Sequence, residues 1–467
     1  MHPSALAKRV YFLIIIIIAF YLYGLGALPL LGPDEPRYAQ VAREMFLSGD
    51  LITPTLGGHT WFEKPALLYW MIVASFKIFG VNEWSARLGP AICGLLTILA
   101  VWLVGREVDF GLWSPVVTAS CLGLIVFSRA ASFDVVITMT TTWSLAFFLL
   151  HELRRKRLLL AGFYAFVGLS LLAKGLVGVV IPFGVVGVYY LLRRSSPARS
   201  VWLSFLWGVP LTLAVSAIWY GPVIAKHGWT FIDEFFIQHH FARYVSNKYH
   251  HPQPIYFYPV IILMLALPWS VHLISALAKV RKWEWRGDDS LSIVRIFSLA
   301  WLLLPLVFFS FSGSKLPGYV LPVLPGAALL VSDRLTFVRN AKCPLLIAGV
   351  TLVAVLVVLN FFAAPYARRE SVRDLLLLAD AHGYANAPVL AQRSDDRSAE
   401  FYAYGRVVYT ANGEPLTFDE ISVDEARARG GRFVVFIPVE YVENFRGAPA
   451  IEIIGDNGKT AVLGWKP

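Results

Sequence analysis

The chain has 467 residues, of which 57% are hydrophobic and only 15% are charged, and its net charge is +10. This balance excludes a soluble domain of ordinary composition, and long apolar runs at repeated intervals are typical of polytopic membrane proteins. The basic residues fall mainly in short loops between the apolar runs, which is the positive-inside pattern and not a nucleic-acid-binding surface. The three cysteines, Cys93, Cys121 and Cys343, have no paired spacing, so neither a disulfide framework nor a zinc knuckle is expected.

Hydropathy predicts about eleven membrane spans of roughly 18 to 22 residues each, the length that a bilayer requires. The first follows Lys8 and Arg9 and is too long for the core of a signal peptide. The apolar segment at 66–80 is short and contains Lys77, so we expect an interfacial or re-entrant helix there. We place the spans near residues 10–31, 86–104, 110–127, 135–151, 158–173, 176–192, 201–222, 255–278, 293–311, 318–335 and 344–363.

The distribution of Lys and Arg predicts the orientation. Basic runs such as 154–157 and 279–286 favour a cytoplasmic position for the N-terminus and for one set of alternate loops. The loops at 32–85 and 223–254 then face outward, to the periplasm of a bacterial inner membrane, together with the tail. Residues 364–467 mix a helical-period run with short strand-like runs, so we expect a transmembrane domain over 1–363 and a small α/β periplasmic domain over 364–467.

Ionisable residues gather on the predicted outer face. The first outer loop carries the densest charge of the first hundred residues, and other outer loops add acids and bases from distant parts of the chain. Such a set suits transfer from a phosphate-linked donor, because cations neutralise the leaving phosphate and a carboxylate removes a proton from, or orients, the attacking group. The residues concerned are Asp34, Glu35, Arg37, Glu63, Lys64, Asp134, Lys174, His240, Arg243 and Lys315.

Structural interpretations compete with these functional ones. Asp34 before Glu35-Pro36 is also a good signal for a helix N-terminus. Glu63 and Lys64 could form an interfacial ion pair, and Asp134 could extend from a span end to the membrane surface. Histidine-rich loops usually bind no metal. Lys174 is harder to explain structurally, because the positive-inside rule disfavours a lysine on the outer side.

Four stretches carry a resemblance to a known family: "GPDEPRYAQVAREMFLSGD", "WFEKPALLYW", "LAKGLVG" and "SKLPGYVLPVLP". They resemble the lipid A 4-amino-4-deoxy-L-arabinose transferases and their wider kin, the bacterial dolichyl-phosphate-mannose-protein mannosyltransferase-like glycosyltransferases. The similarity covers roughly residues 10–335. It implies a GT-C fold with interfacial helices in the first outer loop, a sugar donor on a polyprenyl phosphate, and inversion at the anomeric carbon.

The resemblance also implies roles for individual residues. Catalytic roles fall to Asp34, Glu63 and Asp134, and binding of the donor phosphate falls to Lys64, Lys174, Lys315 and Arg243. We also assign substrate binding to Glu35, Arg37, Tyr38 and Tyr319. Family members can hold a divalent metal (zinc, magnesium or manganese), for which Glu63 and His240 are the candidate ligands here.

The sequence therefore predicts an inner-membrane glycosyltransferase that moves a sugar from undecaprenyl phosphate to an envelope acceptor, with lipid A as one candidate and a protein, as in O-mannosyltransferases, as another. The alternative from a different class is a flippase or transporter of lipid-linked sugars. Transporters tend to have inverted repeats and ionisable groups near the bilayer midplane, and the sequence shows neither feature.

Overall fold

A computed structural model describes residues 3–242, 253–393, 397–410, 413–417 and 431–466. The chain forms two compact units, which we treat separately. Unit 1 contains Met1–Tyr23, Phe62–Leu68 and Gly89–Ala354, and unit 2 contains Gly24–Trp61, Tyr69–Leu88 and Val355–Pro467. Most of the first outer loop thus groups with the C-terminal tail, although residues 89–354 lie between them in the sequence.

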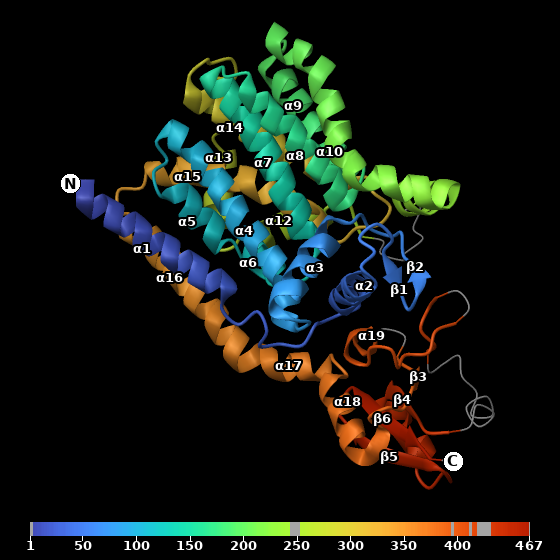
Figure 1. Ribbon diagram of the computed structural model, residues 1–467. Coiled ribbons are helices and arrows are strands. Elements are labelled where there is room, and N and C mark those ends of the chain that lie inside the picture. Colours follow the sequence, from blue (N-terminus) through green and yellow to red (C-terminus); the bar gives the residue numbers. More distant parts are fainter. Residues whose placement is uncertain (1–2, 243–252, 394–396, 411–412, 418–430, 467) are drawn as a thin grey trace. The chain divides into compact units, whose positions relative to one another are not determined.

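Unit 1 is helical (Figure 1). Its elements are α1 (Pro3–Leu22), most of α4 (Glu83–Gly105), α5 (Trp113–Ser120), α6 (Leu122–Ser128), α7 (Phe133–Arg154), α8 (Leu158–Lys174), α9 (Val177–Arg193), α10 (Arg199–Ile232), η2 (Asp233–Ala242), α12 (Phe257–Leu265), α13 (Ser270–Leu277), α14 (Ser290–Ser310), η4 (Pro317–Val323), α15 (Leu324–Thr336) and the greater part of α16 (Lys342–Val357).

Five of the described helical segments are long and apolar enough to cross a membrane: Glu83–Val108, Phe133–Arg154, Arg199–Gln238, Ser290–Ser310 and Lys342–Arg369. Shorter apolar helices include Leu158–Lys174 and Val177–Arg193. Three predicted spans are interrupted. The extended backbone of Cys121 separates α5 from α6, Pro268 lies in the break between α12 and α13, and η4 precedes α15. These breaks were not expected from hydropathy, which averages over a window and does not register a local change of backbone direction.

Close approach of helices in unit 1 depends on small residues. Gly208 in α10 faces the ring of Tyr164 in α8, and a Cβ on this glycine would lie only 2.1 Å from the ring. The Tyr164 hydroxyl lies 2.9 Å from the Ser204 hydroxyl, and Thr212 donates to the Tyr164 carbonyl over 2.9 Å. Small side chains and hydroxyl groups are typical of packed helices in membranes, where the hydrophobic effect does not drive association.

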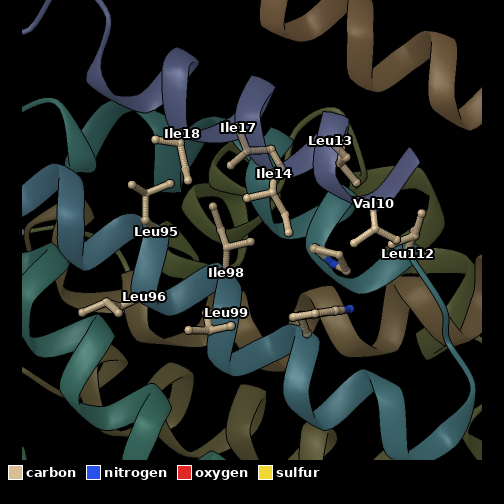
Figure 2. Close-up of a pocket in the computed structure, with 12 residues that line it drawn as sticks. Val10, Leu13, Ile14, Ile17, Ile18, Leu95, Leu96, Ile98, Leu99 and Leu112 are labelled. Carbon is tan, nitrogen blue, oxygen red and sulfur yellow. The ribbon is translucent and has the colours of Figure 1, made fainter. Parts of the chain in front are cut away.

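Unit 1 also contains an apolar cavity of about 250 Å³ between α1, α4 and α5. Figure 2 shows Ile14 and Ile17 of α1 on one side and Leu95 and Ile98 of α4 on the other. The lining is almost entirely hydrocarbon, so this cavity offers no group that could bind a phosphate or activate a sugar.

Unit 2 combines the outer loop with a small α/β domain. The loop contributes α2 (Asp34–Ser48), the antiparallel pair β1 (Thr55–Leu56) and β2 (His59–Thr60), and most of α3 (Leu67–Phe79), which is too short to cross a bilayer. The tail contributes η5 (Val358–Ala363), α17 (Ala364–Arg369), α18 (Arg373–Ala379), η6 (Asp380–Tyr384), β3 (Val389–Ala391), α19 (Ser398–Tyr402), β4 (Phe433–Pro438), η8 (Val439–Phe445), β5 (Ile451–Asp456) and β6 (Thr460–Trp465).

The tail sheet has the order β3-β4-β6-β5, with β3 parallel to β4 and the other pairs antiparallel. Asn457-Gly458 turns the chain between β5 and β6, because Gly458 adopts φ +85° and the Asn457 side chain accepts the amides of Lys459 and Thr460. α18 packs Leu375 and Leu376 on the sheet, where Val434, Phe436 and Val462 are buried.

A buried ion pair organises the outer-loop part of unit 2. Arg87, near the start of α4, donates to both carboxylate oxygens of Glu35 in α2, over 2.9 and 2.7 Å. Its other N–H groups bond to the carbonyls of Leu25, Leu28 and Pro29, each over 2.8 Å. All the hydrogen-bonding capacity of the guanidinium is thereby used to hold the segment that leads into α2.

We expect Arg87→Met to lower the free energy of unfolding by about 3 to 5 kcal/mol, because it leaves the Glu35 carboxylate buried without its cation. Thermal unfolding of the purified chain in detergent measures this change. The control is Arg446→Met, whose guanidinium is exposed and pairs with exposed Glu443, and the double variant Arg87→Met with Glu35→Leu should recover part of the loss. Equal melting of Arg87→Met and wild type would contradict a stabilising role for the pair.

Candidate functional site

Asp134 occupies the first turn of α7, where Ser132 caps the helix by accepting the Asp134 amide over 3.1 Å. Its carboxylate accepts a hydrogen bond from the ammonium of Lys174, the last residue of α8. The two side chains are only 19% and 17% exposed, so water screens their attraction poorly. Each charge also lies at the helix end whose dipole favours it. The acid and the base, 40 residues apart, thus form one charged centre in unit 1.

The chain after α14 completes this centre. The Lys174 ammonium lies 4.6 Å from the centroid of the Tyr319 ring, a cation–π contact. Gly318 lets the backbone approach Asp134, since a Cβ there would lie 1.9 Å from a carboxylate oxygen. Three of the predicted site residues, Asp134, Lys174 and Tyr319, are therefore neighbours.

Lys315, in the same connection, is 9% exposed. Within the residues that the structure describes, its ammonium has neither an ion-pair partner nor a hydrogen-bond acceptor. A buried cation without a counter-ion is costly, so this position favours an anionic ligand supplied from outside the described residues.

Glu63 and Lys64 form an ion pair of 2.9 Å, with side chains 9% and 13% exposed. The preceding Phe62 fixes the segment on α10 by edge-to-face contacts with Phe231 and His227, whose centroids are 5.2 and 5.0 Å from its own. The pair is thus buried within unit 1, on a different connection from the Asp134 centre.

The predicted metal site falls partly on residues that the structure does not describe. The Glu63 carboxylate already has a cation as its neighbour, and the described part of the chain brings no three His, Cys, Asp or Glu side chains together as ligands. The side chain of His240 lies outside the described residues, as does the whole of Arg243. We therefore derive no chemical step from a metal.

Asp34 is the first residue of α2 and follows Pro33, which caps the helix without a side-chain hydrogen bond. Its carboxylate accepts from Arg37, one turn later, and remains 54% exposed. The Arg37 guanidinium lies over the rings of Trp61 and Tyr38, at 5.2 and 5.7 Å. Asp34 therefore has an accessible carboxylate that is paired, within unit 2, with the guanidinium of Arg37.

Glu35 differs from its neighbour. Its carboxylate is buried, is paired with Arg87 and also accepts the Leu31 amide over 2.9 Å. These bonds account for Glu35 as a residue that holds the loop, so we leave it out of the proposed substrate-binding set. Arg87 itself was not singled out from the sequence, because an arginine in "EWSARL" carries no motif that marks its partner.

Comparisons with known proteins agree with this architecture. The family model for dolichyl-phosphate-mannose-protein mannosyltransferase matches residues 63–220. The undecaprenyl phosphate-alpha-4-amino-4-deoxy-L-arabinose arabinosyl transferases of Aeromonas salmonicida and of Pseudomonas aeruginosa strain PAO1 are 31% and 34% identical, over 69% and 68% of this chain. The crystal structure of ArnT from Cupriavidus metallidurans bound to undecaprenyl phosphate matches over 98% of both chains, with a TM-score of 0.76 and 21% identity.

The chain belongs to the ArnT-like GT-C family. This confirms the resemblance inferred from its motifs and gives it the GT-C fold of a polytopic membrane protein. The matched region covers 59% and 57% of the length of the two curated relatives. The activity and substrates of those relatives are therefore proposals for this chain.

The C-terminal part of the chain places a buried carboxylic acid, Glu400, near Arg37. Burial raises the pKa of Glu400 to about 7, although the positive charges of Arg397 and Arg37 oppose the shift. Arg397 lies 3.5 Å from the carboxylate, while the nearby charge of Glu414 disfavours ionisation further. Glu400 is consequently an acid that changes charge near neutral pH, inside unit 2.

Because folding raises the pKa of Glu400, its contribution to stability is complete below about pH 4.5 and is lost as the pH rises through about 7. We expect Glu400→Gln, which cannot ionise, to gain stability relative to wild type between pH 5 and pH 8. Melting curves of both proteins across this range measure the difference. If the difference in stability between the two proteins were the same at pH 5 and at pH 8, Glu400 would not titrate in this window.

Proposed function

We propose that this chain is an inner-membrane glycosyltransferase that moves 4-amino-4-deoxy-L-arabinose from undecaprenyl phosphate to lipid A at the periplasmic face. The names of the curated relatives and the undecaprenyl phosphate bound to the structurally similar ArnT support this donor and sugar. The observation in this chain that carries the proposal is the charged centre of unit 1, where Lys174 and Asp134 pair beside Tyr319 while the buried Lys315 lacks a described counter-ion.

In this reaction an acceptor oxygen attacks the anomeric carbon, and the bond from that carbon to the phosphate oxygen breaks. Undecaprenyl phosphate leaves with the bonding electrons, so its negative charge must be stabilised. Lys315 and Lys174 would bind the phosphate, and Lys64 would add a third positive charge near the membrane face. Attack from the side opposite the leaving phosphate inverts the configuration of the sugar.

Asp34 would act on the acceptor. If the acceptor is a hydroxyl group, the carboxylate takes its proton as the new bond forms, as a general base. If the acceptor is a phosphate of lipid A, it needs no strong base, and Asp34 then orients the amino sugar or the acceptor. Arg37 would hold the carboxylate in place in either case, because it bonds to Asp34 while it lies over Trp61.

The finer topology belongs to the same proposal. About eleven spans, with the N-terminus in the cytoplasm and residues 364–467 in the periplasm, would bring the charged loops to one side of the membrane. The match to the dolichyl-phosphate-mannose-protein mannosyltransferase model keeps a mannose donor and a protein acceptor as the second candidate.

We expect Asp34→Asn to lower transfer by about a hundredfold or more, the usual contribution of an acid–base group. Lipid A and other envelope glycans would be analysed by mass spectrometry in a deletion strain that carries either wild type or Asp34→Asn. Asp50→Asn is the matched control, since Asp50 lies in the same loop and accepts the amides of Ile52 and Thr53, which an asparagine oxygen can also accept.

The outcomes separate the candidates. Loss of a pentosamine-sized addition on lipid A supports the proposed reaction, whereas loss of a hexose-sized addition on another molecule changes the sugar and acceptor. Full activity of a well-expressed Asp34→Asn protein would remove Asp34 from the mechanism, and identical glycomes with and without the wild-type protein would favour a transporter.

Lys315→Met should raise the KM for the polyprenyl-phosphate donor by about 10- to 100-fold, the value of a charge-assisted hydrogen bond to phosphate. Initial rates with purified protein and varied donor concentration give this constant. Lys279→Met, which removes an exposed lysine after α13, is the control and should leave the KM unchanged. An unaltered KM in Lys315→Met would exclude this lysine from the phosphate site.

A further inference from the structure

Within unit 2, the C-terminal domain contacts α2 through α19 and the residues that follow it. Arg43 of α2 donates to the carbonyl of Phe401 over 2.9 Å, and its guanidinium lies 4.3 Å from the centroid of the Tyr404 ring. α2 is the helix that begins at Asp34. The helix that carries the proposed acid is therefore packed against the tail domain.

Tyr402, the last residue of α19, makes the more consequential contact. Its hydroxyl accepts the amide of Leu30 over 2.8 Å and donates to the carboxylate of Glu83, at the start of α4, over 3.1 Å. Leu30 is fully buried and lies four residues before Asp34, but 372 positions before Tyr402. Glu83 also accepts from Arg373 of α18 over 3.2 Å. One phenol thus links the backbone before α2 to the start of another helix.

The segment before Asp34 is consequently held from two directions. Arg87 bonds to carbonyl groups at Leu25, Leu28 and Pro29, whereas Tyr402 bonds to the Leu30 amide. Arg87 belongs to α4 and Tyr402 to the C-terminal domain. Since donors and acceptors of the same short segment are bound by different elements, the tail helps to determine where α2 begins.

We propose that Tyr402 is a positioning residue for sugar transfer, whose hydroxyl holds the segment before α2 so that the Asp34 carboxylate stays directed at the acceptor. This inference rests on the proposed function. It gives the C-terminal domain a part in the reaction through the placement of Asp34, in addition to any role on the outer surface.

The chemistry of the phenol suits a permanent link. Burial and the negative charge of Glu83 raise the pKa of Tyr402, so the hydroxyl keeps its proton and continues to donate to Glu83 at physiological pH. A displacement of about 1 Å in a catalytic group can cost on the order of a hundredfold in rate. Loss of one hydrogen bond beside Leu30 is therefore expected to affect turnover even though Tyr402 is not proposed to touch the substrate.

The test compares two hydroxyl deletions in the full-length protein. Tyr402→Phe removes the bonds to Leu30 and Glu83, whereas Tyr384→Phe removes a bond of 3.1 Å to Glu452 within the same domain and leaves the α2 contacts intact. With undecaprenyl-phosphate-linked aminoarabinose and lipid A as substrates, Tyr402→Phe should lower kcat about tenfold with the donor KM within about twofold of wild type. Tyr384→Phe should change neither constant.

Amide hydrogen exchange of the peptide that contains Leu30 supplies a readout that does not need activity. Exchange at this amide should become about tenfold faster in Tyr402→Phe, because its acceptor is gone, and should stay unchanged in Tyr384→Phe. Wild-type kcat in Tyr402→Phe, or equal losses in both variants, would overturn the positioning role. If wild type itself transfers no sugar from this donor, the proposed function fails, and unchanged exchange in Tyr402→Phe would then overturn the inferred hold on the segment as well.

Discussion

The guanidinium of Arg87 bonds to a carboxylate and to three backbone carbonyls at once, and the geometry of the outer loop depends on it. A segment without regular structure leaves its carbonyl groups without partners, and burying them unpaired would be costly. Arg87 meets this requirement with a single planar group, while Glu35 balances its charge. The adjacent Asp34 is left as the exposed acid of the helix. Two consecutive carboxylates therefore have different tasks because their surroundings differ.

The unit 1 centre follows from the same electrostatic constraint. A charge close to hydrocarbon persists where an opposite charge or a helix end compensates it. Asp134 and Lys174 satisfy this condition mutually and through the dipoles of α7 and α8. Lys315 has no such partner among the described residues, and an anionic donor would supply one. Lys315 precedes by three residues the glycine that packs against Asp134, and a cation without a described counter-ion at this position suits a substrate that carries a phosphate.

The division of the chain into units changes how the tail is understood. By sequence, residues 364–467 form an appendage that follows the last predicted span. By contacts, they share a compact unit with the first outer loop, through Arg43, Tyr402 and Arg373. The hydrogen bonds that the tail shares with this loop limit the substitutions that either segment can accept.

The sequence by itself determined the membrane class, the family and most of the charged residues worth considering, because apolar runs and ordered motifs are local properties of the chain. It also predicted a mixed helix-and-strand tail. Only the tertiary structure decided which charges pair: Glu35 with Arg87, Asp134 with Lys174, and the Leu30 amide with Tyr402. Hydropathy likewise did not reveal the breaks at Cys121 and Pro268. The paired residues lie 40 to 372 positions apart in the sequence. Their pairing depends on how distant helices pack, which no local sequence pattern encodes.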